Sequence, residues 1–164
     1  MIILAQILVA LGPSLFNVDN TSAEILLKTN AAATPKLYVA DLNLTQINEY
    51  TSPSGQYHHY YPNSLTTNTA YQYIFELSPG SFTNWYYFVT PSTAPMKFAI
   101  WGDNQIGNQI FTGIVTKFIE EGAYYWLGAG DYIQNEGYEA DWISQFYTPT
   151  SPWLPYIPKV GTRG

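Results

Sequence analysis

The sequence predicts a β-sandwich followed by an α/β segment with the order strand, helix, strand, helix. Three observations predict it. Over about the first ninety residues, short apolar and aromatic runs alternate with clusters of turn residues. Two prolines within the stretch 91–95 then end this pattern. Beyond them, two compact apolar strands flank one amphipathic helix, which is typical of a strand–helix–strand unit.

Composition excludes several classes of protein. The 164 residues carry a net charge of −6, with 17% aromatic and 11% charged residues. Disordered chains are poor in aromatics and rich in charge, so disorder is excluded. So acidic a chain is also a poor ligand for a phosphate backbone, and no nucleic-acid partner is expected. The absence of cysteine excludes disulfides, thiolate zinc sites, iron–sulfur clusters and a cysteine nucleophile.

The N-terminal residues 1–11 are apolar except for Gln6. The run is too short to span a bilayer, so no stable membrane span is expected. Two interpretations stay open: a first β-strand, or the remnant of a secretory signal. The second interpretation favours an extracellular or periplasmic location.

The first domain is predicted to occupy residues 12–91. Tyr71, Tyr73 and Phe75 alternate with their neighbours, as expected for a strand with one buried face. The runs rich in β-branched and aromatic residues predict strands at 23–28, 36–41, 56–61, 70–77 and 84–90. Proline, glycine, asparagine and serine separate these runs, and such spacing is typical of a sandwich.

Residues 92–95 are predicted to be a linker, and 96–164 a second unit. Here strands are expected at 97–101 and 123–128, and helices at 108–121 and 138–146. A strand–helix–strand order predicts two parallel strands joined by a right-handed crossover.

Two glycine–aspartate pairs follow the two strands of this second unit: Gly102 with Asp103, and Gly130 with Asp131. Parallel strands deliver their following loops to one edge of the sheet, where α/β folds bind ligands. Two carboxylates held close together repel each other unless a cation lies between them. The pattern therefore favours a metal site for hard or borderline ions. The alternative is that each aspartate is a turn residue or a helix N-cap.

Other polar and aromatic groups are given structural roles. His58 and His59 are adjacent on a predicted strand and point to opposite faces, so they are not expected to share a metal. The aromatic runs, one of which includes Tyr57, favour sandwich core over a sugar-binding platform. Lys159 and Arg163 are expected to be solvated.

At these residues the chain resembles a known family. Residues 98–105, with Asp103 and Gln105, resemble the first motif of the calcineurin-like metallophosphoesterases, and 130–137 resemble the second. Residues 142–164 resemble the approach to the third motif. Residues 12–91 resemble the fibronectin-type-III-like domain that precedes the catalytic domain of purple acid phosphatases.

The resemblance implies a metal-binding hydrolase of the acid phosphatase type. Asp103 would bind a first metal, Asp131 would bridge two metals, and Gln105 stands where many relatives have a histidine ligand. The ions would be Fe, Mn or Zn, and a metal-bound hydroxide would hydrolyse a phosphate-ester substrate. At the position of the tyrosine ligand of purple members this chain has Gln134, so no purple species is expected.

The third motif and the later histidine motifs do not occur in the 164 residues. The chain is therefore interpreted as the C-terminally incomplete, N-terminal part of such an enzyme, inactive by itself, with no catalytic residue and no cofactor-binding residue assigned. Whether it is an enzyme stays open. The alternative is an extracellular β-sandwich module for binding or adhesion without catalysis. The oligomeric state is not predicted.

Overall fold

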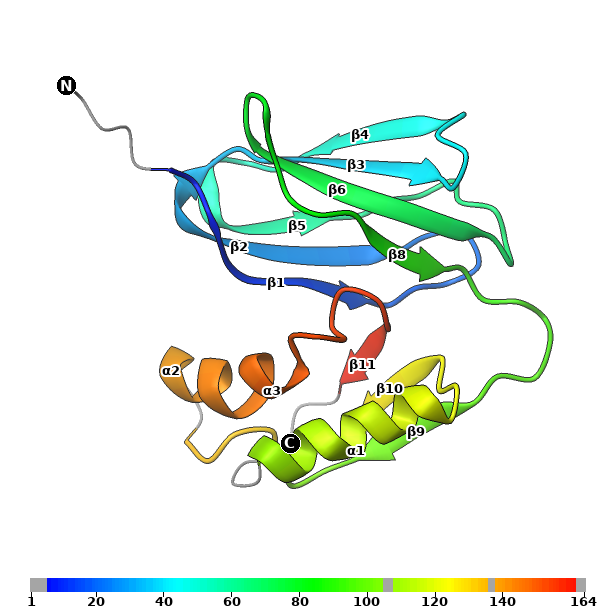
Figure 1. The fold of residues 1–164 in the computed structure, drawn as a ribbon, viewed down its shortest axis with the longest axis vertical. Helices are drawn as coiled ribbons and strands as arrows, with labels where there is room; N and C mark the ends of the chain where they lie inside the picture. The colour runs from blue at the N-terminus through cyan, green and yellow to red at the C-terminus, as the bar shows by residue number, and fades with distance from the viewer. Residues whose placement is uncertain (1–5, 105–107, 136–137, 162–164) are drawn as a thin grey trace.

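The computed structural model describes residues 6–104, 108–135 and 138–161, and Figure 1 shows their arrangement. The first part of the chain is made of strands. They are β1 (Val9–Phe16), β2 (Glu24–Ala33), β3 (Lys36–Asp41), β4 (Ile47–Thr51), β5 (Gly55–Tyr60), β6 (Ala70–Ser78), β7 (Ser81–Phe82) and β8 (Tyr86–Val89).

These strands form two facing sheets. In one sheet β2 lies between β1 and β5, and all three are antiparallel. In the other, β3 and β6 are central, with β4, β7 and β8 at their sides. The inward side chains of both sheets form one apolar core, in which Leu15, Ile25, Val39, Tyr73 and Phe75 are fully buried. The predicted sandwich is confirmed.

The second part of the chain follows the predicted order of strands and helices. Its elements are β9 (Phe98–Trp101), α1 (Asn108–Glu120), β10 (Tyr125–Gly128), α2 (Glu139–Asp141), the π-helical turn η1 (Trp142–Tyr147), α3 (Thr148–Thr150) and β11 (Lys159–Gly161). Strands β9, β10 and β11 are parallel. Helix α1 packs Phe111 and Val115 against Trp101 and Trp126 of the sheet, which makes a second core. The predicted fold class is therefore confirmed.

Some local predictions needed correction. The second helix was expected at 138–146, but helical structure covers 139–150, because Pro149 is accepted within a terminal turn. Strand β4 was not predicted, because its sequence, INEYT, contains few apolar residues. In the structure its side chains alternate between exposed and half-buried. Residues 1–5 lie outside the described part, so the two interpretations of the N-terminus stay open.

The two parts share one sheet. Its strand order is β5-β2-β1-β11-β10-β9, in which Phe16 of β1 is aligned with Lys159 of β11. The Leu15 amide also donates a hydrogen bond of 2.8 Å to the Leu154 carbonyl. Strand β11 thus covers the edge of β1 that the sandwich alone would leave unpaired. The domain boundaries at 91 and 96 stay predictions.

Lys159 is buried rather than solvated, which corrects the expectation from sequence. It is 6% exposed, and its ammonium lies 3.9 Å from the ring centre of Phe146 and 4.4 Å from that of Tyr132. Burial lowers the pKa of the Lys159 amine to about 8. The strand that carries it is placed by tertiary packing, a cause that charge and local pattern do not reveal.

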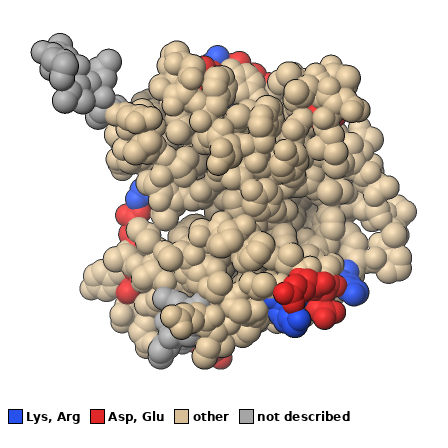
Figure 2. Space-filling model, in the orientation of Figure 1, with Lys and Arg blue, Asp and Glu red and all other residues tan. Residues whose placement is uncertain are grey.

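The surface carries few charges, as the composition requires. Figure 2 shows one face that is mostly uncharged, with acidic and basic side chains gathered near its lower edge. Lys117 and Glu120, both exposed on α1, form an ion pair of 2.5 Å. No helix in the described ranges is long and apolar enough to cross a membrane.

Candidate metal centre

The two aspartates of the glycine–aspartate pairs occupy equivalent places at one edge of the parallel sheet. Trp101, at the end of β9, is aligned with Gly128, at the end of β10. Asp103 and Asp131 follow these ends, and both are exposed. The loops also contact each other, since the backbone N–H of Asn104 donates a hydrogen bond of 3.2 Å to the backbone carbonyl of Asp131. The structure therefore brings the two predicted aspartates to the same edge, as the parallel strands required.

Both aspartates have an unusual backbone conformation. Asp103 has φ 55° and Asp131 has φ 50°, in the left-handed region that most residues avoid. Before them, Gly130 has a positive φ of 114°, but Gly102 does not. A glycine with a positive φ therefore precedes the aspartate only in the second loop. Such conformations persist where the surrounding structure fixes them, and they occur often at functional sites.

Asn104 fixes the first loop to the second. It is 6% exposed, and its Oδ1 accepts a hydrogen bond of 2.9 Å from Nε1 of Trp101. Its Nδ2 donates to the carbonyl of Tyr132 at 3.0 Å and to that of Gln145 at 3.3 Å. One side chain therefore joins β9, the Asp131 loop and η1. The sequence pattern does not distinguish Asn104 from an ordinary turn residue, which is the usual role of asparagine in a loop.

Tyr132, in the second loop, packs against Gly128 at the end of β10. Its hydroxyl donates a hydrogen bond of 2.6 Å to the carbonyl of Gly128, and its ring lies over that glycine. A Cβ at Gly128 would lie 2.2 Å from the Tyr132 hydroxyl oxygen. Gly128 therefore has to be a glycine, because the Tyr132 ring occupies the space that a side chain would need.

Replacing Gly128 with alanine is expected to lower the free energy of unfolding by about 2–3 kcal/mol, because the tyrosine ring must move. Urea denaturation of both proteins measures the change. Gly113→Ala on α1 is the matched control, since nothing lies within 4 Å of its added Cβ. That change is expected to be neutral or stabilising. Equal stability of Gly128→Ala and the unmodified chain would contradict the packing argument.

The structure does not complete the predicted ligand set. Gln105, the third candidate metal ligand, lies outside the described residues, as do residues 162–164 beyond β11. Gln134 lies near η1, where its backbone N–H donates a hydrogen bond of 2.7 Å to Oε1 of Gln145. Within the described ranges, no group of three or more His, Cys, Asp or Glu side chains could hold a metal ion.

The two histidines belong to the sandwich, far from this edge in the fold. His58 is buried, with Nδ1 2.7 Å from the Ser52 hydroxyl and Nε2 3.1 Å from that of Thr29. Burial lowers the pKa of its imidazole, which favours the neutral ring. His59 faces the opposite way and is exposed. Their predicted structural role is in keeping with these contacts.

Comparison with known proteins rests on structure alone, since no family model and no curated protein matches the sequence. The fold is similar to that of a structure of PhoD, with a TM-score of 0.66 and 15% identity, over 92% of this chain and 38% of that chain. It is also similar to the purple acid phosphatase PPD1 from yellow lupin (Lupinus luteus) seeds, with a TM-score of 0.71 and 17% identity, over 93% of this chain and 34% of that chain.

The chain thus spans just over a third of the length of these two solved structures. At such low identity, the likeness establishes the fold and not the activity. The resemblance to purple acid phosphatases, drawn from motifs, is confirmed at the level of fold. The continuous match across both parts of the chain also agrees with the shared sheet.

Proposed function

We propose that this chain is the N-terminal part of a metal-dependent phosphoesterase that hydrolyses phosphate esters. One observation carries the proposal. On a phosphoesterase-like fold, Asp103 and Asp131 follow adjacent parallel strands, and both adopt a positive φ at the same sheet edge. The shared edge supports a joint site more than the positive φ does, because Asn17, Leu44, Ser64 and Asn68 also have a positive φ. The alternative of a binding module without catalysis has no comparable support.

The donor chemistry fits a metal ion, although the number of donors is incomplete. Carboxylate oxygens from Asp103 and Asp131 suit Fe, Mn or Zn, and Gln105 would add an amide oxygen. A stable site needs about three or four protein ligands. When bound, the metal would supply a Lewis acid that acidifies water and neutralises charge on the phosphoryl oxygens.

The chain's own residues would hold and orient that centre. Asp103 and Asp131 present exposed carboxylates, and Asn104 keeps the two loops in fixed register through its three side-chain hydrogen bonds. We expect weak metal binding and no useful turnover by these 164 residues alone, because two carboxylates leave most of the coordination sphere to water. An extracellular or periplasmic location is part of the proposal.

Manganese binding tests the proposal without relying on activity. Mn²⁺ broadens the NMR signals of nearby amides, so the signals around Asp103 and Asp131 are expected to broaden first. Asp131→Asn is expected to weaken this effect about tenfold, since it removes a charged donor. Glu120→Gln, which removes an exposed carboxylate on α1, is the matched control and is expected to behave like the unmodified chain.

Two results would overturn parts of this proposal. Equal broadening in Asp131→Asn and in the unmodified chain would exclude the aspartate pair as a metal site. Hydrolysis of p-nitrophenyl phosphate by the chain with Mn²⁺, lost in Asp131→Asn, would confirm the site and contradict the expected inactivity.

A further inference from the structure

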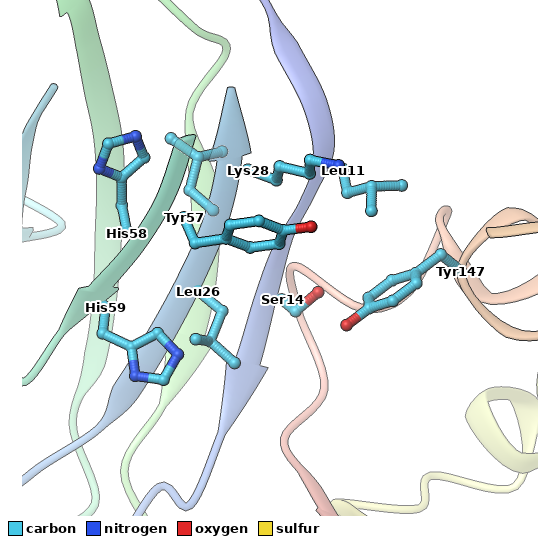
Figure 3. A pocket seen from close by; sticks show the side chains of 9 residues that line it. Leu11, Ser14, Leu26, Lys28, Tyr57, His58, His59 and Tyr147 are labelled. Atoms are coloured by element: carbon cyan, nitrogen blue, oxygen red, sulfur yellow. The ribbon is translucent and has the colours of Figure 1, made fainter. Parts of the chain in front are cut away.

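A hollow lies where the sandwich meets the helical segment 139–150, and neither Asp103 nor Asp131 lines it. Its volume is about 160 Å³, and its lining includes Ser14, Lys28, Tyr57 and Tyr147. It adjoins a second hollow of about 360 Å³, because Leu11, Tyr57 and Tyr147 line both. We call the two together the junction pocket; Figure 3 shows the first from close by.

Three hydroxyl groups face this space. In Figure 3 the oxygens of Tyr57 and Tyr147 come from opposite sides of the pocket, and that of Ser14 lies between them. Ser14 is 2% exposed, and it lines the wall of the first hollow. A polar atom of a water or a ligand in the hollow can therefore reach its hydroxyl and form a hydrogen bond with it.

The two charged side chains that line the pocket neutralise each other. Lys28 and Glu139 form an ion pair, and the Tyr57 hydroxyl donates to the same carboxylate at 3.0 Å. The hydrogen bond from Lys28 lowers the pKa of the Glu139 carboxyl, and the carboxylate in turn raises the pKa of Lys28. Both groups are therefore charged at neutral pH and neutralise each other. An anion would have to compete with Glu139 for Lys28, which disfavours a phosphate ligand.

The rings supply flat apolar faces beside the hydroxyl groups. Tyr57 and Tyr147 line the first hollow together with Leu11 and Leu26, and Trp142 adds an indole to the second. A pocket that takes a drug-sized ligand is about 300–1,000 Å³, so the first hollow has room for a smaller molecule only. Aromatic rings beside hydroxyl groups match a ring that has both apolar C–H faces and hydroxyl edges.

We propose that the junction pocket binds a small neutral polyhydroxylated ring, such as one pyranose unit of a saccharide. The Ser14 hydroxyl would form a hydrogen bond with a ligand hydroxyl, and the sugar ring would lie between Tyr57 and Tyr147. This site is separate from the aspartate edge and does not depend on the proposed phosphoesterase function.

NMR titration of the 164-residue chain with methyl β-D-glucopyranoside and with cellobiose tests the proposal. Saturable shifts are expected at the amides of Leu11, Ser14, Lys28 and Tyr57, with a Kd of about 1–10 mM for one sugar ring. Tyr57→Ala is expected to weaken binding about tenfold, and Ser14→Ala about threefold. Ser14→Ala removes a single hydroxyl, so it is expected to fold normally.

The controls separate this site from nonspecific effects. Tyr87→Ala removes a tyrosine that is 49% exposed on β8, in the other sheet, and is expected to leave sugar binding unchanged. Inorganic phosphate is expected to shift none of the pocket amides. The proposal is overturned if neither sugar gives saturable shifts up to about 50 mM. It is also overturned if phosphate binds there more tightly, or if Ser14→Ala binds sugar as well as the unmodified chain.

Discussion

Asn104→Ala is expected to lower the free energy of unfolding by about 3 kcal/mol, because it removes three side-chain hydrogen bonds. These bonds join Asn104 to the indole N–H of Trp101 and to the carbonyls of Tyr132 and Gln145. For a domain of this size, such a loss corresponds to a fall in Tm of about 10 °C. Differential scanning calorimetry measures it directly.

Asn104→Asp distinguishes hydrogen bonding from loss of volume. Aspartate keeps an oxygen for the Trp101 indole, but it replaces the donating Nδ2 with a second acceptor that faces two carbonyls. It is therefore expected to destabilise the chain at least as much as alanine does. Asn63→Ala, at an exposed asparagine of the sandwich, is the control and is expected to change stability by less than about 0.5 kcal/mol. If Asn104→Ala behaved like this control, Asn104 would not join the two loops.

The same substitution is expected to loosen the aspartate edge. Hydrogen exchange at the amides of residues 102–104 and 129–132 should quicken in Asn104→Ala while the sandwich strands stay protected. Manganese-induced broadening should weaken as well, because the two carboxylates no longer keep a fixed register. Unchanged exchange in both loops would show that strand pairing alone positions them.

Lys159→Met is expected to have a large effect of opposite sign and to stabilise the folded chain at pH 7. Burial disfavours the ammonium of Lys159, which lies in the second core with its pKa lowered to about 8. A shift of this size corresponds to about 3 kcal/mol, and the rings of Phe146 and Tyr132 offset part of it by cation–π attraction. Methionine has a similar length and no charge, so the gain is expected to be about 1–3 kcal/mol.

The stability of the unmodified chain is expected to depend on pH through the Lys159 amine. In the unfolded chain the lysine has its ordinary pKa of 10.5, and in the folded chain it has a pKa of about 8. Between these values the unfolded chain binds more protons, so stability rises with pH over this window; below pH 8 both states are protonated and the penalty is constant. Buried tyrosines, such as Tyr73 with its raised pKa, act in the opposite direction above pH 10.

Chemical denaturation at pH 7, 8, 9 and 10 separates these contributions. The stability of the unmodified chain should approach that of Lys159→Met as the pH rises from 8 to 10. Lys117→Met on the exposed face of α1 is the matched control, and its difference from the unmodified chain is expected to stay constant. A constant difference for Lys159→Met over the same range would show that the amine keeps its ordinary pKa in the folded chain.

Local pattern predicted much of the architecture. The alternation of Tyr71, Tyr73 and Phe75 marked β6, and the apolar positions of 108–121 marked α1 within one residue of its end. Period-two and period-3.6 burial are properties of single elements, so a sequence displays them. The same reasoning placed Asp103 and Asp131 at one edge, because parallel strands fix where their loops emerge.

Tertiary structure alone decided the features that join distant segments. The pairing of β1 with β11 brings Phe16 beside Lys159, and it converts an expected surface lysine into a buried one. Asn104 gains its role because Trp101, Tyr132 and Gln145 converge on it from three elements. The sequence by itself determined most of the strands, helix α1 and the places of the two glycine–aspartate loops. The neighbours of each polar group depend on contacts between residues far apart in the chain, and no local period records these.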